Sequence, residues 1–140
     1  MKSRDALRLK RFDVEKKRRK VAEIEAMIEG FNQLALDLDR QIAFEQERAG
    51  IFDVNHYAYP SFAKAAIQRR NNLTASAANL QATLAAARED LEQATAELKK
   101  RELLEERDAR CSQASEAQLR AFELGSIAQK RAPAEADAPN

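Results

Sequence analysis

The chain has 140 residues, of which 34% are charged and 44% hydrophobic, with three Gly, three Pro and no Trp. This composition is typical of long charged helices rather than of a globule with a deep core. One Cys excludes an internal disulfide, and a single His among turn residues gives no indication of a catalytic triad or of a cysteine–histidine metal site. Without a Gly-rich phosphate loop, we expect no enzyme, no cofactor and no small-molecule substrate.

The formal net charge of +1 hides an uneven distribution. Residues 1–20 carry ten Lys and Arg against three acidic residues, whereas residues 21–60 carry two basic and eight acidic residues. A basic end beside an acidic stretch indicates either a partner with acidic or phosphate groups or a solvated helix face that keeps a rod soluble. The chain lacks an apolar run of about 18 residues, so we expect no membrane span and a cytoplasmic protein.

The first predicted helix runs over residues 3–48 and carries apolar residues at two alternating heptad positions. One position holds Val21, Ile28, Ala35 and Ile42, and the other holds Ile24, Phe31 and Leu38. Alternating spacings of three and four residues keep an apolar seam on one side of the helix, which is the geometry of a coiled coil. Near the basic end, Leu9 and Phe12 are expected as extra contacts of this seam.

A connector over residues 49–60 contains Gly50, Asp53, Asn55 and Pro60, all of which favour a turn. Four of the chain's eight aromatic residues lie here or just after it: Phe52, Tyr57, Tyr59 and Phe62. Two interpretations stay open for this tip. The aromatic side chains either close the end of the seam, or they anchor an interface with a partner.

The second helix is predicted over residues 61–129, with a second seam of Leu73, Leu80, Ala87 and Ala94 alternating with Ala77, Leu84, Leu91 and Leu98. Folding about residue 53 places Ile42 opposite Lys64 and Leu7 opposite about residue 99. The predicted fold is therefore all-α: a long antiparallel two-helix coiled-coil hairpin over residues 1–131, in which Leu103 to Gln129 overhang. Residues 132–140 are expected to form a disordered tail.

The basic residues of the first helix permit more than one function. A basic helix that runs into heptads is similar to the basic region of a bZIP protein, but this seam turns back at Gly50 instead of pairing two parallel copies. A nucleic-acid-binding coiled coil and a generic scaffold or chaperone stay open as alternatives. The overhang either docks on another protein or frays.

Several segments resemble the FliJ family of flagellar export proteins, of the alphaproteobacterial type. They lie within residues 1–110 and comprise MKSRDALRLKRFDVEKKRR at 1–19, IEAMI at 24–28, YPSFAKAA at 59–66, QRRNNL at 68–73, ELKK at 97–100 and LLEERD at 103–108. The resemblance implies a non-enzymatic component of the bacterial flagellar type III export apparatus. Such a component serves swimming motility and lies in the cytoplasm, peripherally associated with the inner face of the cell membrane at the flagellar base.

The resemblance also implies partners. The rod acts as a stalk that inserts into the flagellar export ATPase ring, links it to the export gate membrane protein and escorts substrate chaperones, with no nucleic acid expected. If this ring contact is carried over to the present chain, the resemblance assigns it to the basic end, through Arg4, Arg8, Lys10, Arg11, Lys17, Arg18, Arg19, Lys99, Lys100 and Arg101. The tip would face the gate or another partner through Tyr57, Tyr59, Pro60, Phe62, Arg69 and Arg70.

Overall fold

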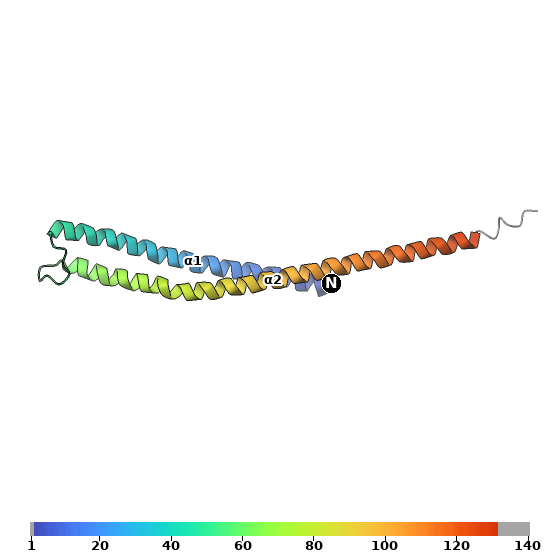
Figure 1. Cartoon of the computed structure of the whole chain (residues 1–140), viewed down its shortest axis with the longest axis horizontal. Coiled ribbons are helices and arrows are strands. Elements are labelled where there is room, and N and C mark those ends of the chain that lie inside the picture. The colour runs from blue at the N-terminus through green and yellow to red at the C-terminus, as the bar shows by residue number, and fades with distance from the viewer. Residues whose placement is uncertain (1, 132–140) are drawn as a thin grey trace, which may run out of the picture.

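The computed structural model describes the backbone of residues 2–131 and the side chains of residues 4–126. Two helices, α1 (Lys2–Ala49) and α2 (Ser61–Arg131), run antiparallel and pack against each other (Figure 1). This confirms the predicted all-α helical hairpin. Each helix boundary lies within two residues of the predicted one, and the expected disordered tail lies outside the described residues.

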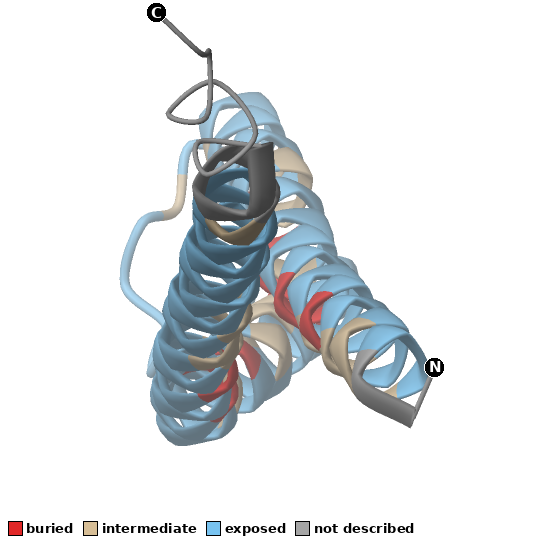
Figure 2. Ribbon diagram, turned by 90° about the vertical axis from the view of Figure 1, so that its right-hand side faces the viewer, coloured by how far each residue is buried: buried red, intermediate tan, exposed pale blue. Residues whose placement is uncertain are grey.

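The predicted seam forms the core. Val21, Ile24 and Ile28 of α1 pack with Ala77, Leu84 and Ala87 of α2, and Phe31, Leu80 and Leu91 lie half-buried around them. Figure 2 shows the buried residues on the facing sides of the two helices. Along α2 many of the buried residues are alanines, from Ala63 to Ala94, so the branched side chains of α1 fit into shallow holes between the helices.

Four ion pairs join the helices and define their register. They are Lys10–Glu97 at 3.5 Å, Arg11–Glu102 at 3.6 Å, Glu25–Arg88 at 3.5 Å and Asp39–Arg70 at 2.9 Å. Taken together, the four pairs and the depression that Arg4 shares with Arg101 and Glu105 place Leu7 opposite about Leu103 of α2 rather than opposite residue 99. The predicted register was therefore several residues short. The connector between Ala49 and Ser61 is centred near residue 55, not residue 53.

The unpaired part of α2 consequently begins later than predicted. Arg101 and Glu105 are half-buried, whereas every described side chain from Glu106 to Gly125 is exposed. We call residues 106–131 the overhang; it continues α2 as a single helix beyond the start of α1 (Figure 1). Leu119, Phe122 and Leu124 are exposed on it by 63%, 75% and 68%. In the described part of the chain, no helix has the length and apolarity needed to span a bilayer.

Candidate functional site

The connector, which we call the tip (residues 50–60), is organised by its own hydrogen bonds. Gly50 ends α1 with a φ of 69°, and its N–H donates to the carbonyls of Gln46 and Glu47. The Asn55 N–H donates to Asp53 Oδ1 at 3.0 Å, and the Ala58 N–H donates to His56 Nδ1 at 3.0 Å. These local bonds give the tip a defined shape before any partner binds.

The two tyrosines of the tip have opposite environments. Tyr59 is 7% exposed, and its hydroxyl accepts a hydrogen bond from Gln46 Nε2 at 2.9 Å, so it closes the end of the seam above Ala63. Tyr57 is 96% exposed and stacks only on His56, with ring centroids 4.7 Å apart. The plug interpretation is therefore confirmed for Tyr59, whereas Tyr57 lies on an open surface and its role as an interface anchor stays a prediction.

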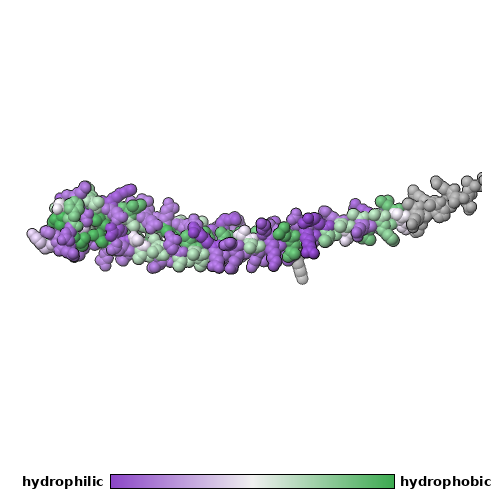
Figure 3. All heavy atoms as spheres, viewed as in Figure 1, coloured by the Kyte–Doolittle hydropathy of each residue, from purple (hydrophilic) through white to green (hydrophobic). Residues whose placement is uncertain are grey.

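Other large apolar side chains share this open end of the rod. Phe52 and Phe62 are more than half exposed, Val54 is exposed, and Pro60 is half-buried. In Figure 3 apolar atoms gather at this end of the molecule. Exposed aromatic groups on a preorganised loop are the usual anchors of a protein interface, because little conformational entropy is lost when they are buried.

The two arginines assigned to the tip lie further along α2. Arg70 occupies a seam position, where its guanidinium donates to Asp39 Oδ1 at 2.9 Å and to Asn71 Oδ1 at 3.1 Å. Arg69 is exposed. At about 1.5 Å per residue, both lie more than 10 Å along α2 from Ser61, and neither lines the depression that Tyr57 shares with Lys64 and Gln68.

The basic residues of the other end divide into two groups. Cations next to an acidic side chain form ion pairs: Lys10 with Glu97, Arg11 with Glu102, Lys17 with Asp13 and Arg18 with Glu15. Within residues 4–126, the structure gives no ion pair to Arg4, Arg8, Arg19, Lys99, Lys100 or the half-buried Arg101. Both groups together are the residues predicted to contact the ring, and we call them the basic collar. The cations of the second group have no ion-paired acidic neighbour to compete with a partner, whereas those of the first group form exposed and therefore weak pairs.

The seam ends in polar residues, which the sequence analysis missed. Arg101 and Glu105 continue the heptad after Leu98, and Arg101 Nε and Glu105 Oε1 are buried without a hydrogen-bond partner among the described residues. Continuing the seven-residue count past Leu98 would have revealed them. Unsatisfied buried polar atoms destabilise the packing, so this mouth of the hairpin is held less firmly than the tip.

Two exposed apolar residues contradict their predicted role. Leu9 and Phe12 were expected as extra seam contacts, but they are 68% and 63% exposed on α1. The seam positions at this level are occupied by Leu7, Lys10 and Val14, which are half-buried or buried. Positions two residues away from a seam residue lie on the outer side of the helix.

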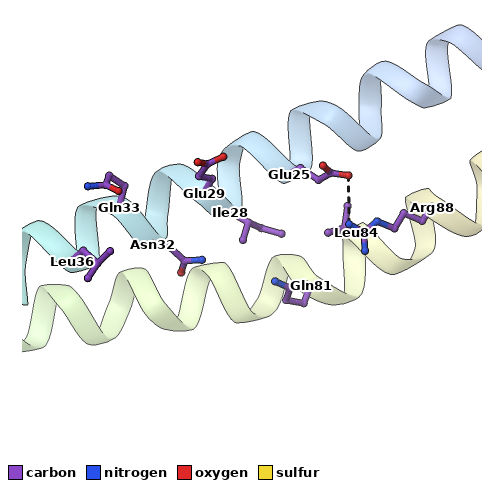
Figure 4. Close-up of a pocket in the computed structure, with 9 residues that line it drawn as sticks. All are labelled: Glu25, Ile28, Glu29, Asn32, Gln33, Leu36, Gln81, Leu84 and Arg88. Carbon is purple, nitrogen blue, oxygen red and sulfur yellow. Dashed lines mark hydrogen bonds and ion pairs between the residues drawn. The ribbon is translucent and has the colours of Figure 1, made fainter.

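The depressions between the helices are shallow. One of about 320 Å³ lies beside the core, where Ile28 and Leu84 form its floor and Glu25 pairs with Arg88 at its rim (Figure 4). Among the described side chains no group of His, Cys, Asp and Glu could hold a metal ion. The single His lies in the tip, and the exposed Cys111 lies on the overhang.

Comparison of the chain with protein-family models, with curated proteins and with solved structures found no match.

Proposed function

We propose that this chain is a stalk that inserts into the ring of the flagellar export ATPase and couples it to protein export. The observation that carries the proposal is the shape of the rod: a two-helix hairpin from which α2 continues alone, with cations gathered where α1 begins. A single helix is about 10–12 Å wide with its side chains, which suits the lumen of a protein ring.

In this proposal the overhang enters the ring first and the basic collar follows. Lys99 and Lys100 of α2, with Arg4 and Arg8 of α1, contact acidic groups of the ring through their unpaired charges. Electrostatic attraction of this kind accelerates association and orients the two partners. The resemblance of residues 1–110 to the FliJ family supports the same partner.

The tip contacts a second partner at the far end of the rod. Tyr57, Phe52 and Phe62 supply exposed aromatic area on a loop that is already ordered. The export gate at the membrane and substrate chaperones are the partners proposed for this surface. The tip and the ring-inserted mouth then lie at opposite ends of the hairpin, so both contacts can exist at once.

The ring contact is tested by charge reversal on α2. Lys99→Glu with Lys100→Glu should weaken binding to a purified flagellar export ATPase at least about tenfold in a sedimentation assay, because two attractive contacts become repulsive. Neither lysine forms an ion pair in the described structure, so the fold should stay intact. Unchanged binding would refute insertion through the basic collar.

The matched control carries the same charge change at the other end of α2. Lys64→Glu with Arg69→Glu also exchanges two exposed cations for two anions, and it should leave ATPase binding unchanged. Duplex DNA in the same assay separates the alternative function. Salt-sensitive DNA binding that is lost in the Lys99 and Lys100 variant, with no ATPase binding by the original chain, would favour a nucleic-acid-binding coiled coil.

A further inference from the structure

The outer side of α1 near its start carries an apolar pair that the hairpin does not use. Leu9 and Phe12 are three residues apart and therefore neighbours on one helix face. They are 68% and 63% exposed, and they point away from the seam formed by Leu7, Lys10 and Val14. Nothing in the described part of the chain covers them.

Cations surround this pair on the same side of the helix. Arg8 is adjacent to Leu9 and one turn before Phe12, while Lys16 and Arg19 extend the line of Phe12 by four and seven residues. All three are exposed, and none has an ion pair within residues 4–126. By contrast, Lys10, Arg11 and Lys17 are all paired with carboxylates.

We propose that Arg8, Leu9, Phe12, Lys16 and Arg19 form a lipid face that binds the surface of an anionic bilayer. A helix with this arrangement lies in the plane of the interface, with its apolar side chains at the boundary of the acyl chains and its cations among the lipid phosphates. The rest of α1 and the whole of α2 stay outside the bilayer.

Charge and shape favour a bilayer over other anionic partners. A nucleic acid would attract the three cations but would leave Leu9 and Phe12 in water, since they lie in the middle of the charged group. A folded protein would need a groove for this convex single-helix face, whereas a bilayer deforms around it. Asp5 and Glu23 limit the face at its two ends. Asp90 of α2 lies at the edge of the depression that contains Lys16 and Arg19, while Asp13 and Glu15 are ion-paired with Lys17 and Arg18.

The lipid face goes beyond the proposed stalk function and does not depend on it. It shares Arg8 and Arg19 with the basic collar, so this end of α1 would bind the bilayer and the ring at different times. The two tests use different residues, because the charge reversal of the stalk changes only Lys99 and Lys100 of α2. Vesicle binding also requires only the full chain and no ATPase. Failure of one proposal therefore leaves the other standing.

The direct test exploits the absence of Trp from the chain. Phe12→Trp introduces a single indole at the centre of the lipid face, and Phe44→Trp introduces one at a position with the same exposed fraction, 63%, in the acidic part of α1. Both variants are titrated with vesicles of phosphatidylcholine alone or with phosphatidylglycerol. We expect a blue shift of the indole emission of the Phe12→Trp variant only with phosphatidylglycerol, and no shift for the Phe44→Trp variant.

A flotation assay with the same vesicles measures how much the three cations and the apolar pair each contribute to vesicle affinity. Arg8→Gln, Lys16→Gln and Arg19→Gln together should weaken binding about 100-fold, because the loss of each cation weakens it about fivefold. Leu9→Ser with Phe12→Ser should weaken it about tenfold or more. Because all five residues are exposed, circular dichroism should show unchanged helix content in both variants.

Three results would overturn the lipid face. The first is no flotation of the original chain with phosphatidylglycerol. The second is equal emission shifts for the Phe12→Trp and Phe44→Trp variants. The third is full binding after Leu9→Ser with Phe12→Ser, because binding by charge alone would instead indicate a polyanion such as nucleic acid.

Discussion

The two ends of the hairpin are built differently, although the same seam runs between them. At the tip, Tyr59 is buried, its hydroxyl is bonded, and the loop is fixed by local hydrogen bonds. At the mouth, the seam ends in Arg101 and Glu105 with unsatisfied polar atoms, and the ion pairs between the helices, such as Lys10–Glu97, are exposed and therefore weak. The tip is therefore preorganised and the mouth is loosely held, which suits one fixed contact and one adaptable contact.

The largest effect is expected at the plug of the tip. Tyr59→Ala removes a buried ring and a hydrogen bond, so we expect it to lower the free energy of unfolding by about 3 kcal/mol. Tyr57→Ala, two residues away and 96% exposed, should change it by less than about 0.5 kcal/mol. Urea denaturation followed by circular dichroism measures both. Equal effects of the two variants would show that Tyr59 does not close the seam.

The mouth should respond in the opposite direction. Arg101→Leu with Glu105→Leu replaces two polar seam residues by apolar ones, which extends the seam and removes the unsatisfied atoms Nε and Oε1. We expect the free energy of unfolding to rise by about 1–2 kcal/mol.

Leu103→Ala and Glu106→Ala serve as controls for the mouth, since these neighbouring residues are exposed and do not occupy seam positions. Each should change the free energy of unfolding by less than about 0.5 kcal/mol. A lower stability of the Arg101 and Glu105 variant than of the original chain would mean that the mouth is held by polar contacts, and the contrast between the two ends would fail.

Sequence periodicity predicts the seam well because a heptad fixes which side of each helix is buried. It does not fix the register, because the ends of two helices joined by eleven residues can be offset by several residues. The four interhelical ion pairs, taken together, reveal the actual offset. Periodicity also fails inside the tip, where Tyr57 and Tyr59 look equivalent and only the hydrogen bonds of the folded loop separate them.

For the candidate surfaces, charge composition identifies the basic end but not its organisation. Ten cations in the first twenty residues are visible in the sequence. Their division into paired and unpaired groups depends on which acidic residues of α2 lie opposite, and so on the register. The exposed positions of Leu9 and Phe12 could have been predicted, because both fall outside the spacing set by Leu7, Lys10 and Val14.

Two glycines provide a smaller comparison between the tip and the seam region. Gly50 has a φ of 69°, where a side chain is strained, so Gly50→Ala should lower the free energy of unfolding by about 1 kcal/mol. Gly30 lies inside α1 with open space where an alanine methyl group would stand, so Gly30→Ala should raise it by about 0.5–1 kcal/mol. Thermal unfolding of both variants tests this difference of sign, and two effects of equal sign would contradict it.

The smallest effect is expected for the ion pairs of the mouth. Lys10 and Glu97 lie 3.5 Å apart with side chains 40% and 69% exposed, so water and salt screen their attraction. Glu97→Gln should therefore lower the free energy of unfolding by no more than about 0.5 kcal/mol, and this difference should vanish at high salt. Glu92→Gln is the control, since Glu92 is exposed and has no ion pair in the described structure. A loss of unfolding free energy well above this value and independent of salt would contradict the prediction. It would show that the pair is rigid and desolvated and that it holds the mouth closed.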